Sequence, residues 1–272
     1  MAKISKSIVL LLVVLLFSSG LHAQRTINIK GAKGTGELVG RISYEEARRE
    51  ALNKAKVEAL RKAGVSEHLQ SYESLFRSEG DNDFSEFFSS DIQSELQGAV
   101  KDYEIVNHER KVDPQTNLFT VEVTIDATVV LYDTKPDPTF NVRVEGIKGV
   151  YEVGEMLTFS VFATQKCYLH IFNISDTYTT QMYPNAWESF IEIPSNKKIT
   201  FPFEQIIEYE LFKESDKPEL NRLVLVFTKK PIHFLNHSGG EEQKTSSEAI
   251  FSWIYGLTPD VRKVDYQVFT LR

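Results

Sequence analysis

Residues 119–131 alternate strictly between apolar and polar side chains over most of their length. The apolar positions are Phe119, Val121, Val123, Ile125, Ala127 and Val129. Threonine or a carboxylate occupies each position between them. A period of two is typical of an antiparallel strand with one face buried and one exposed. The chain therefore has to supply a layer that packs on the apolar face of this strand.

A helix between Ser43 and Gly64 is the segment best suited to that layer. Ser43 is a good N-cap residue, and Glu46 three positions later completes a capping box. Alanines recur every four residues at Ala47, Ala51, Ala55 and Ala59, with Leu52 and Ala63 on the same broad face. Such a face of small side chains favours close packing against a sheet. Gly64 supplies the usual C-terminal stop.

Residues 24–132 are predicted to form an α+β domain, with helices covering one face of a small antiparallel sheet. A short strand is expected at 26–30, and we interpret the glycine-rich stretch 31–36 as a flexible connection to the helix. Two more helical segments are expected within 66–97. One carries an apolar stripe, for which a core face is favoured over a ligand groove. The stripe consists of Phe84, Phe88, Ile92 and Leu96.

Residues 133–138 are predicted to be a linker, because Pro136 and Pro138 favour an extended chain that continues neither a helix nor a central strand. Beyond it, residues 139–272 are rich in short apolar runs separated by turn residues, which predicts a mainly-β, sandwich-like domain. A helix is expected at 247–255, after a polar loop. The strands are expected at 140–144, 156–163, 168–174, 191–193, 198–203, 223–227 and 264–271.

The first 23 residues are typical of a secretory signal peptide. Lys3 and Lys6 precede an apolar run, and Ala23 provides the small residue before cleavage. The run is shorter than the roughly 20 residues that span a bilayer, so cleavage is favoured over an uncleaved anchor. We expect the mature chain to begin at Gln24, to be exported to the periplasm or the medium, and to have no membrane span.

The cysteine content and the net charge argue against a disulfide, a lipid anchor and two classes of partner. Cys167 is the single cysteine, so we expect no internal disulfide and no lipid anchor after the cleavage site. The formal net charge is −7, which argues against nucleic acid or an anionic membrane surface as a partner.

Sequence motifs for phosphate or dinucleotide binding are incomplete. The cluster Gly31–Gly36 is followed by Glu37 and Leu38, where a phosphate-binding loop requires lysine and then serine or threonine. Read as a dinucleotide fingerprint, Gly34, Gly36 and Gly40 have one residue too many in the second gap.

Motifs for metal binding and nucleophilic catalysis are incomplete too. His233 and His237 stand four apart, but Phe234 replaces the glutamate of a zinc protease. The stretch 81–83 begins like a calcium loop and then lacks the required glycine and final glutamate. Cys167 has no histidine-paired signature around it, and free cysteines are often simply buried. We therefore expect a non-catalytic protein with no cofactor and no metal.

The N-terminal domain resembles that of the flagellar assembly protein T and of related small envelope lipoproteins. The resemblance runs through the early strand with Gly31, the alanine-rich helix with Gly64-Val65, the stretch 98–105, and the alternating strand 119–131. It covers most of residues 26–132 and implies a non-catalytic role in envelope assemblies. Unlike those lipoproteins, this chain lacks the acylated cysteine.

The C-terminal domain resembles a family of unknown function found in secreted bacterial proteins. The matching elements lie in order over residues 140–232 and imply an accessory module with no known reaction. They are Tyr151-Glu152-Val153-Gly154-Glu155, Leu157-Thr158-Phe159, Cys167-Tyr168-Leu169, Met182-Tyr183-Pro184-Asn185 and Leu223-Val224-Leu225-Val226.

These observations favour a protein-binding or assembly module whose partner is another envelope protein. A secreted small-molecule or glycan binder is the alternative, and a hydrolase with a site assembled from distant residues is less favoured. The candidate binding patch is Tyr183, Asn185 and Trp187, because a turn that carries aromatic side chains often contacts partners. For Trp187 alone, packing of the indole on its own domain is favoured about two to one, given the area that tryptophan buries.

Overall fold

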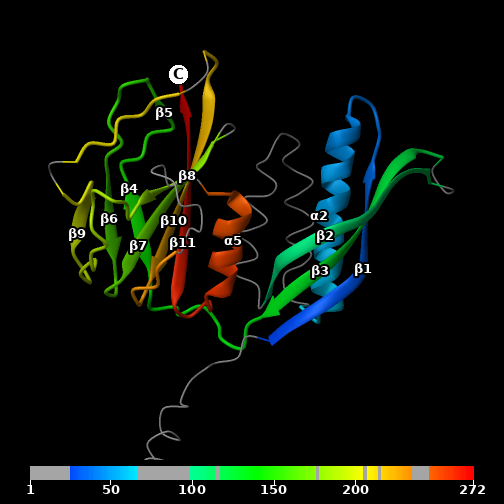
Figure 1. The fold of residues 1–272 in the computed structure, drawn as a ribbon, viewed down its shortest axis with the longest axis horizontal. Helices are drawn as coiled ribbons and strands as arrows, with labels where there is room; N and C mark the ends of the chain where they lie inside the picture. The colour runs from blue at the N-terminus through cyan, green and yellow to red at the C-terminus, as the bar shows by residue number, and fades with distance from the viewer. Residues whose placement is uncertain are drawn as a thin grey trace, which may run out of the picture.

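The computed structural model has a mixed α+β architecture in which strands predominate (Figure 1). It describes residues 25–65, 98–113, 117–175, 178–204, 207–213, 216–234 and 245–272. The N-terminal part contains β1 (Arg25–Glu37), α2 (Tyr44–Lys62), β2 (Gly98–Val112) and β3 (Phe119–Leu131). The C-terminal part contains β4 (Val142–Glu145), β5 (Val150–Tyr151), β6 (Phe159–Ala163), β7 (Tyr168–Ser175), β8 (Thr179–Tyr183), β9 (Lys198–Phe201), β10 (Glu219–Thr228), α5 (Ser247–Gly256) and β11 (Arg262–Leu271).

The N-terminal part is a three-stranded antiparallel sheet in the order β1-β3-β2, with α2 on one face. The alternation of β3 is confirmed from Val121 onward, since Val121, Val123 and Ile125 are fully buried against the helix, whereas Phe119 at the start of the strand is 50% exposed. The capping box is confirmed too: the amide of Glu46 donates to Ser43 Oγ, and the amide of Ser43 donates to the Glu46 carboxylate. The helical segments expected within 66–97 lie outside the described residues, as does the expected signal peptide.

The glycine-rich stretch is part of β1, so its interpretation as a flexible connection is wrong. Gly34 and Gly36 pair with Val123 and Val121 across the sheet. A Cβ on Gly36 would lie 1.9 Å from the carbonyl oxygen of Ala47, and one on Gly34 would lie 2.0 Å from that of Ala51. These glycines are needed because the helix backbone lies directly on the strand.

The C-terminal part contains two sheets, a five-stranded sheet in the order β5-β11-β10-β7-β8 and a three-stranded sheet in the order β4-β6-β9. Their facing sides share one core. Phe159 and Phe201 stack within it, with ring centroids 4.8 Å apart. The pair β5–β11 is parallel, and the other paired strands are antiparallel.

Most of the strands with four or more residues were located from the sequence. The runs expected at 168–174, 198–203, 223–227 and 264–271 correspond to β7, β9, β10 and β11, and the expected helix corresponds to α5. The expected run 191–193 contributes only a single bridge between Ile193 and Cys167. Strands β5 and β8 were not predicted, because β5 has two residues and β8 is largely polar.

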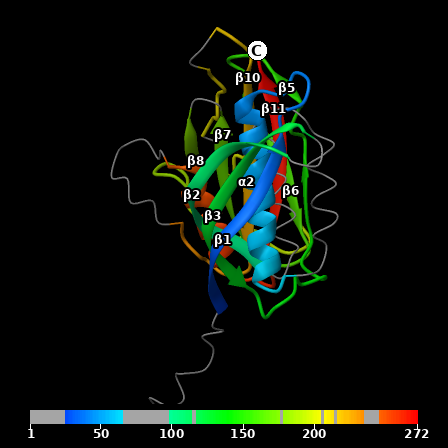
Figure 2. The same ribbon diagram turned by 90° about the vertical axis from the view of Figure 1, so that its right-hand side faces the viewer.

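Helix α5 lies between the two parts of the molecule, as Figure 1 shows, and Figure 2 gives the same arrangement from the side of α2 and β1. One face of α5 covers the five-stranded sheet, and the helix also contacts the start of β2. Tyr132 donates from its hydroxyl to the carbonyl of Tyr255 at 2.9 Å, and Arg262 donates to the carbonyl of Ile254 at 2.7 Å. A third core therefore joins the two parts. Its buried members are Ala99, Val130, Tyr132, Phe172, Ile174, Val224, Val226, Ile250, Ile254, Tyr255 and Leu257.

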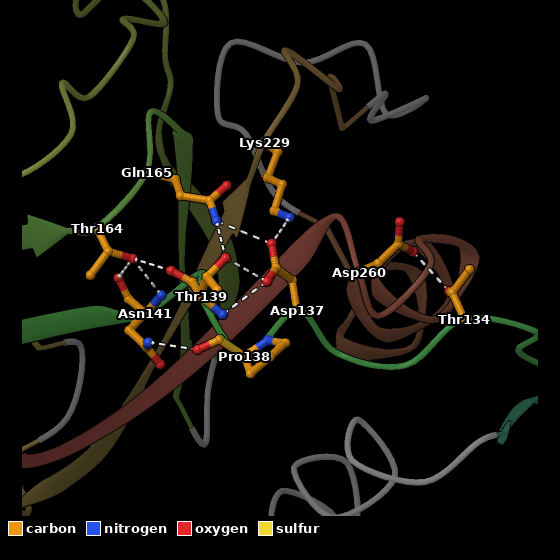
Figure 3. Close-up of polar contacts among 9 residues, drawn as sticks. All are labelled: Thr134, Asp137, Pro138, Thr139, Asn141, Thr164, Gln165, Lys229 and Asp260. Atoms are coloured by element: carbon orange, nitrogen blue, oxygen red, sulfur yellow. Dashed lines mark hydrogen bonds and ion pairs between the residues drawn. The ribbon is translucent and has the colours of Figure 1, made fainter.

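Asp137, within the expected linker, is tied to the C-terminal part by four polar contacts (Figure 3). Its carboxylate accepts from Lys229, from the side-chain amide of Gln165 at 3.0 Å, and from the amide and hydroxyl of Thr139. The bond with Lys229 is the main reason that the pKa of Asp137 lies well below its ordinary value. These contacts hold the C-terminal end of the linker in place.

His170 on β7 is fully buried among aromatic rings beneath α5. Its ring centroid lies 4.7 Å from that of Phe190 and 4.8 Å from that of Trp253. Neither ring nitrogen has a hydrogen-bond partner within the described part of the chain. Burial, with a smaller contribution from nearby His233, lowers the pKa of His170 to about 3. The imidazole is therefore neutral in the folded protein at neutral pH.

We expect Gly36→Ala to lower the free energy of unfolding by about 3 kcal/mol or more, because the new methyl group would overlap the backbone of α2. Urea denaturation checks this value. Gly149→Ala is the matched control, since a Cβ there has nothing within 4 Å. Equal stability of the two variants would contradict the close packing of α2 on β1.

We expect His170 to make the protein less stable in acid. The unfolded chain binds a proton below the ordinary pKa of 6.5, whereas the folded chain binds it only near pH 3. The contribution is complete above pH 6.5 and is lost as the pH falls toward 3, at up to about 1.4 kcal/mol per pH unit. Urea denaturation at several pH values should show a shallower acid slope for His170→Phe. Identical slopes for both proteins would rule out the neutral buried imidazole.

Candidate functional site

The predicted patch lies on the segment that follows β8, residues 184–192, which we name the Trp187 loop. Tyr183 at its start is fully buried rather than exposed. Its ring packs edge-on against Phe203, with centroids 5.0 Å apart. The Tyr183 hydroxyl donates to the carbonyl of Ser189 at 2.7 Å and accepts from the amide of Ile191 at 2.9 Å. Tyr183 therefore anchors the loop and offers no surface to a partner.

Asn185 uses both ends of its side-chain amide within the protein. Its Oδ1 accepts from the amides of Trp187 and Glu188, each at 2.8 Å. Its Nδ2 donates to the carbonyl of Met182 and to the hydroxyl of Tyr209, each at 2.7 Å. An asparagine that accepts from the amide two residues on closes a local turn. The role of Asn185 is thus to shape the loop.

Glu188 is a buried carboxylate, only 1% exposed, that joins the loop to the strands beneath it. Its Oε1 accepts from the amides of Phe203 and Glu204, and its Oε2 accepts from the hydroxyl of Tyr209 at 2.7 Å. Burial, followed by the bond to Glu188, raises the pKa of Tyr209 well above its ordinary value. A carboxylate with three donors is stably held despite its burial.

Trp187 is the member of the predicted patch that reaches solvent. Its side chain is 82% exposed, so packing of the indole on its own domain, which was the favoured interpretation, is wrong. Its backbone amide is held by Asn185, two residues earlier. The loop therefore presents a large aromatic ring from a backbone that is fixed on both sides.

Glu188 and Tyr209 were missed as site residues from the sequence. They are 21 residues apart, and the bond between them depends on how β8 and β9 are placed. A glutamate in a predicted turn is most simply read as a surface residue, because glutamate is seldom fully buried unless paired. The turn at Asn185, by contrast, could be predicted from the sequence, because an asparagine after proline is a local turn signal.

The cysteine, histidine and calcium-loop candidates from the sequence do not form a catalytic or metal site in the described residues. Burial raises the pKa of the Cys167 thiol to about 12, so the thiol stays protonated at neutral pH and is a poor nucleophile. His233 contacts the ring of Phe190, with centroids 5.0 Å apart, and His237 lies outside the described residues. Residues 81–83 lie outside them as well. In the ranges that the structure describes, no three potential ligands cluster as a metal site would require.

No helix of the described residues has the length and apolar character needed to cross a membrane.

We expect Glu188→Ala to destabilise the protein by about 3 kcal/mol, because two amides and one hydroxyl lose their acceptor. Glu192→Ala is the control, since Glu192 forms an exposed ion pair with Lys166 and such pairs contribute little. Thermal or urea denaturation measures both. If the two variants are equally stable, Glu188 does not hold the Trp187 loop.

No protein-family model matches this chain, and no curated protein matches it.

Proposed function

We propose that this chain is an exported, non-catalytic accessory protein of the cell envelope, and that its sandwich-like C-terminal domain binds another envelope protein through the Trp187 loop. The observation that carries the proposal is the 82% exposure of the Trp187 side chain. Tryptophan is among the residues that contribute most to protein interfaces. Its exposure on a fixed loop favours contact with a partner over a role in the protein's own core.

The rigidity of the loop supports this role. Asn185 and Glu188 hold the backbone on either side of Trp187 through internal hydrogen bonds. A partner that covers the indole would therefore lose little free energy in ordering the loop. The indole has few rotatable bonds, so it adds contact area at a small entropic cost.

A protein partner is favoured over a small molecule or a glycan. Sites for small ligands are concave and surround most of the ligand with several side chains. In this loop Tyr183 is buried, which leaves the Trp187 ring as the aromatic surface that the predicted patch offers. The N-terminal domain resembles non-catalytic envelope modules, and the C-terminal domain resembles an accessory module with no known reaction. Both resemblances favour the same interpretation.

We expect Trp187→Ala to weaken partner capture about thirtyfold, since an interface tryptophan often contributes roughly 2 kcal/mol. The measurement is covalent cross-linking in intact producing cells at native expression, with the captured proteins identified by mass spectrometry. Val106→Ala is the matched control, because Val106 is an exposed apolar residue, 49% accessible, in the N-terminal part.

Both variants should keep the thermal stability of the parent protein, because Trp187 has its side chain in solvent. Unchanged capture by a folded Trp187→Ala protein would remove this loop as the contact surface. A parent protein that captures nothing, and remains free in periplasm or medium, would contradict the envelope-assembly function itself.

A further inference from the structure

Residues 208–212 form a free strand edge in the C-terminal part. On its inner side this segment is paired with residues 154–157: the amide of Leu157 donates to the carbonyl of Tyr209 at 2.8 Å, and the amide of Leu211 donates to that of Glu155 at 2.9 Å. Between these two bonds, Met156 and Glu210 form an antiparallel bridge. The segment therefore has the course of a short strand beside 154–157.

The outer side of this edge carries unused backbone groups. Glu210 sits between the two inner bonds, so its own amide and carbonyl point away from the 154–157 segment. The period of two gives Glu208 and Phe212 the same orientation. Within the described residues, the amides and carbonyls of these three positions have no hydrogen-bond partner.

Successive side chains of residues 208–212 point to opposite faces, with the same period of two. Leu211 is buried, whereas Glu208, Glu210 and Phe212 are exposed, with 65% of Phe212 accessible to solvent. Met156, opposite Glu210, is 41% exposed. The exposed face of the edge thus combines two carboxylates with two large apolar side chains.

Glu208 and Glu210 form no salt bridge with any described residue, whereas Glu145, Glu155 and Glu192 elsewhere on this part are each bound to a lysine. Two unpaired negative charges beside unused amides and carbonyls are complementary to an extended segment that carries positive charge.

The edge of β2 has features that discourage pairing with another strand. Its register is interrupted twice, between Val100 and Asp102 and between Ile105 and Asn107. It also carries Lys101 and Lys111, and bulges and lysines are devices that discourage pairing with another strand. The 208–212 edge has neither a lysine nor a proline.

We propose that the 208–212 edge binds an extended basic segment of a partner protein by adding it as a strand. The partner's backbone bonds to the outward groups of Glu208, Glu210 and Phe212, its lysine or arginine side chains lie opposite the two glutamates, and an apolar side chain covers Phe212. The Trp187 ring is not part of this surface, although Tyr209 of the edge bonds to Asn185 and Glu188 in the Trp187 loop. The proposal goes beyond the proposed function.

The test uses the full chain and a short fluorescent peptide that alternates lysine with valine. Fluorescence anisotropy should show saturable binding that weakens with added salt. Two control peptides should not bind: one alternates glutamate with valine, and one is the lysine peptide with its backbone amides methylated. The first control tests the charge, and the second tests the strand pairing.

Three variants locate the site. Glu210→Pro removes the outward amide, which has no partner within the described residues, and should abolish binding while the fold is retained. The double substitution Glu208→Gln and Glu210→Gln should weaken binding about tenfold through the loss of two cross-strand charge pairs. Glu104→Gln, at an exposed glutamate of β2, and Trp187→Ala should leave binding unchanged.

Thermal denaturation confirms that each variant is folded. The proposal is overturned if the lysine peptide does not bind, if the methylated peptide binds equally well, or if Glu210→Pro binds like the parent protein. Loss of peptide binding in Trp187→Ala would move the site to the Trp187 loop and would also overturn the edge assignment. Because partner capture by Trp187 is measured separately, either proposal can fail without the other.

Discussion

The close contact between α2 and β1 is the constraint on which the N-terminal part depends. Alanines on the helix and glycines on the strand bring the two backbones together, and the apolar face of β3 lies beside them. Larger side chains at Gly34, Gly36, Ala47 or Ala51 would separate the layers and expose the valines of β3. The small residues therefore set the distance between helix and sheet, and the valines fill the space that this distance leaves.

The sequence predicted the elements whose signals are local. Strand β3 has a period of two, and α2 has both caps and a four-residue alanine repeat, so each could be located without its partners. The glycine stretch was misread because glycine is typical both of loops and of strands under close contact, and only the position of α2 distinguishes these cases. Strands β5 and β8 depend on tertiary pairing, because neither has an apolar pattern of its own.

The residues of the candidate site also fall into two groups: those that a local sequence signal predicts and those whose position depends on tertiary contacts. The turn at Asn185 is local and was predicted, whereas the burial of Glu188 follows from amides and a hydroxyl that come from distant positions. Trp187 was expected to be buried and is exposed instead. Tryptophan is buried on average, but this loop directs the ring outward. The network beneath the loop explains how the backbone that carries the exposed ring is kept in a fixed place.

The position of β11 has a consequence for how the chain folds as it is synthesised. Strand β11 lies between β5 and β10, although it is the last of these strands in sequence. The N-terminal part contains its sheet and helix within residues 25–131, so it can form a core early. The five-stranded sheet has a gap until residues 262–271 have emerged, and α5 has no complete surface to cover before then. The N-terminal part therefore has all the strands of its sheet before the C-terminal part has all of its own.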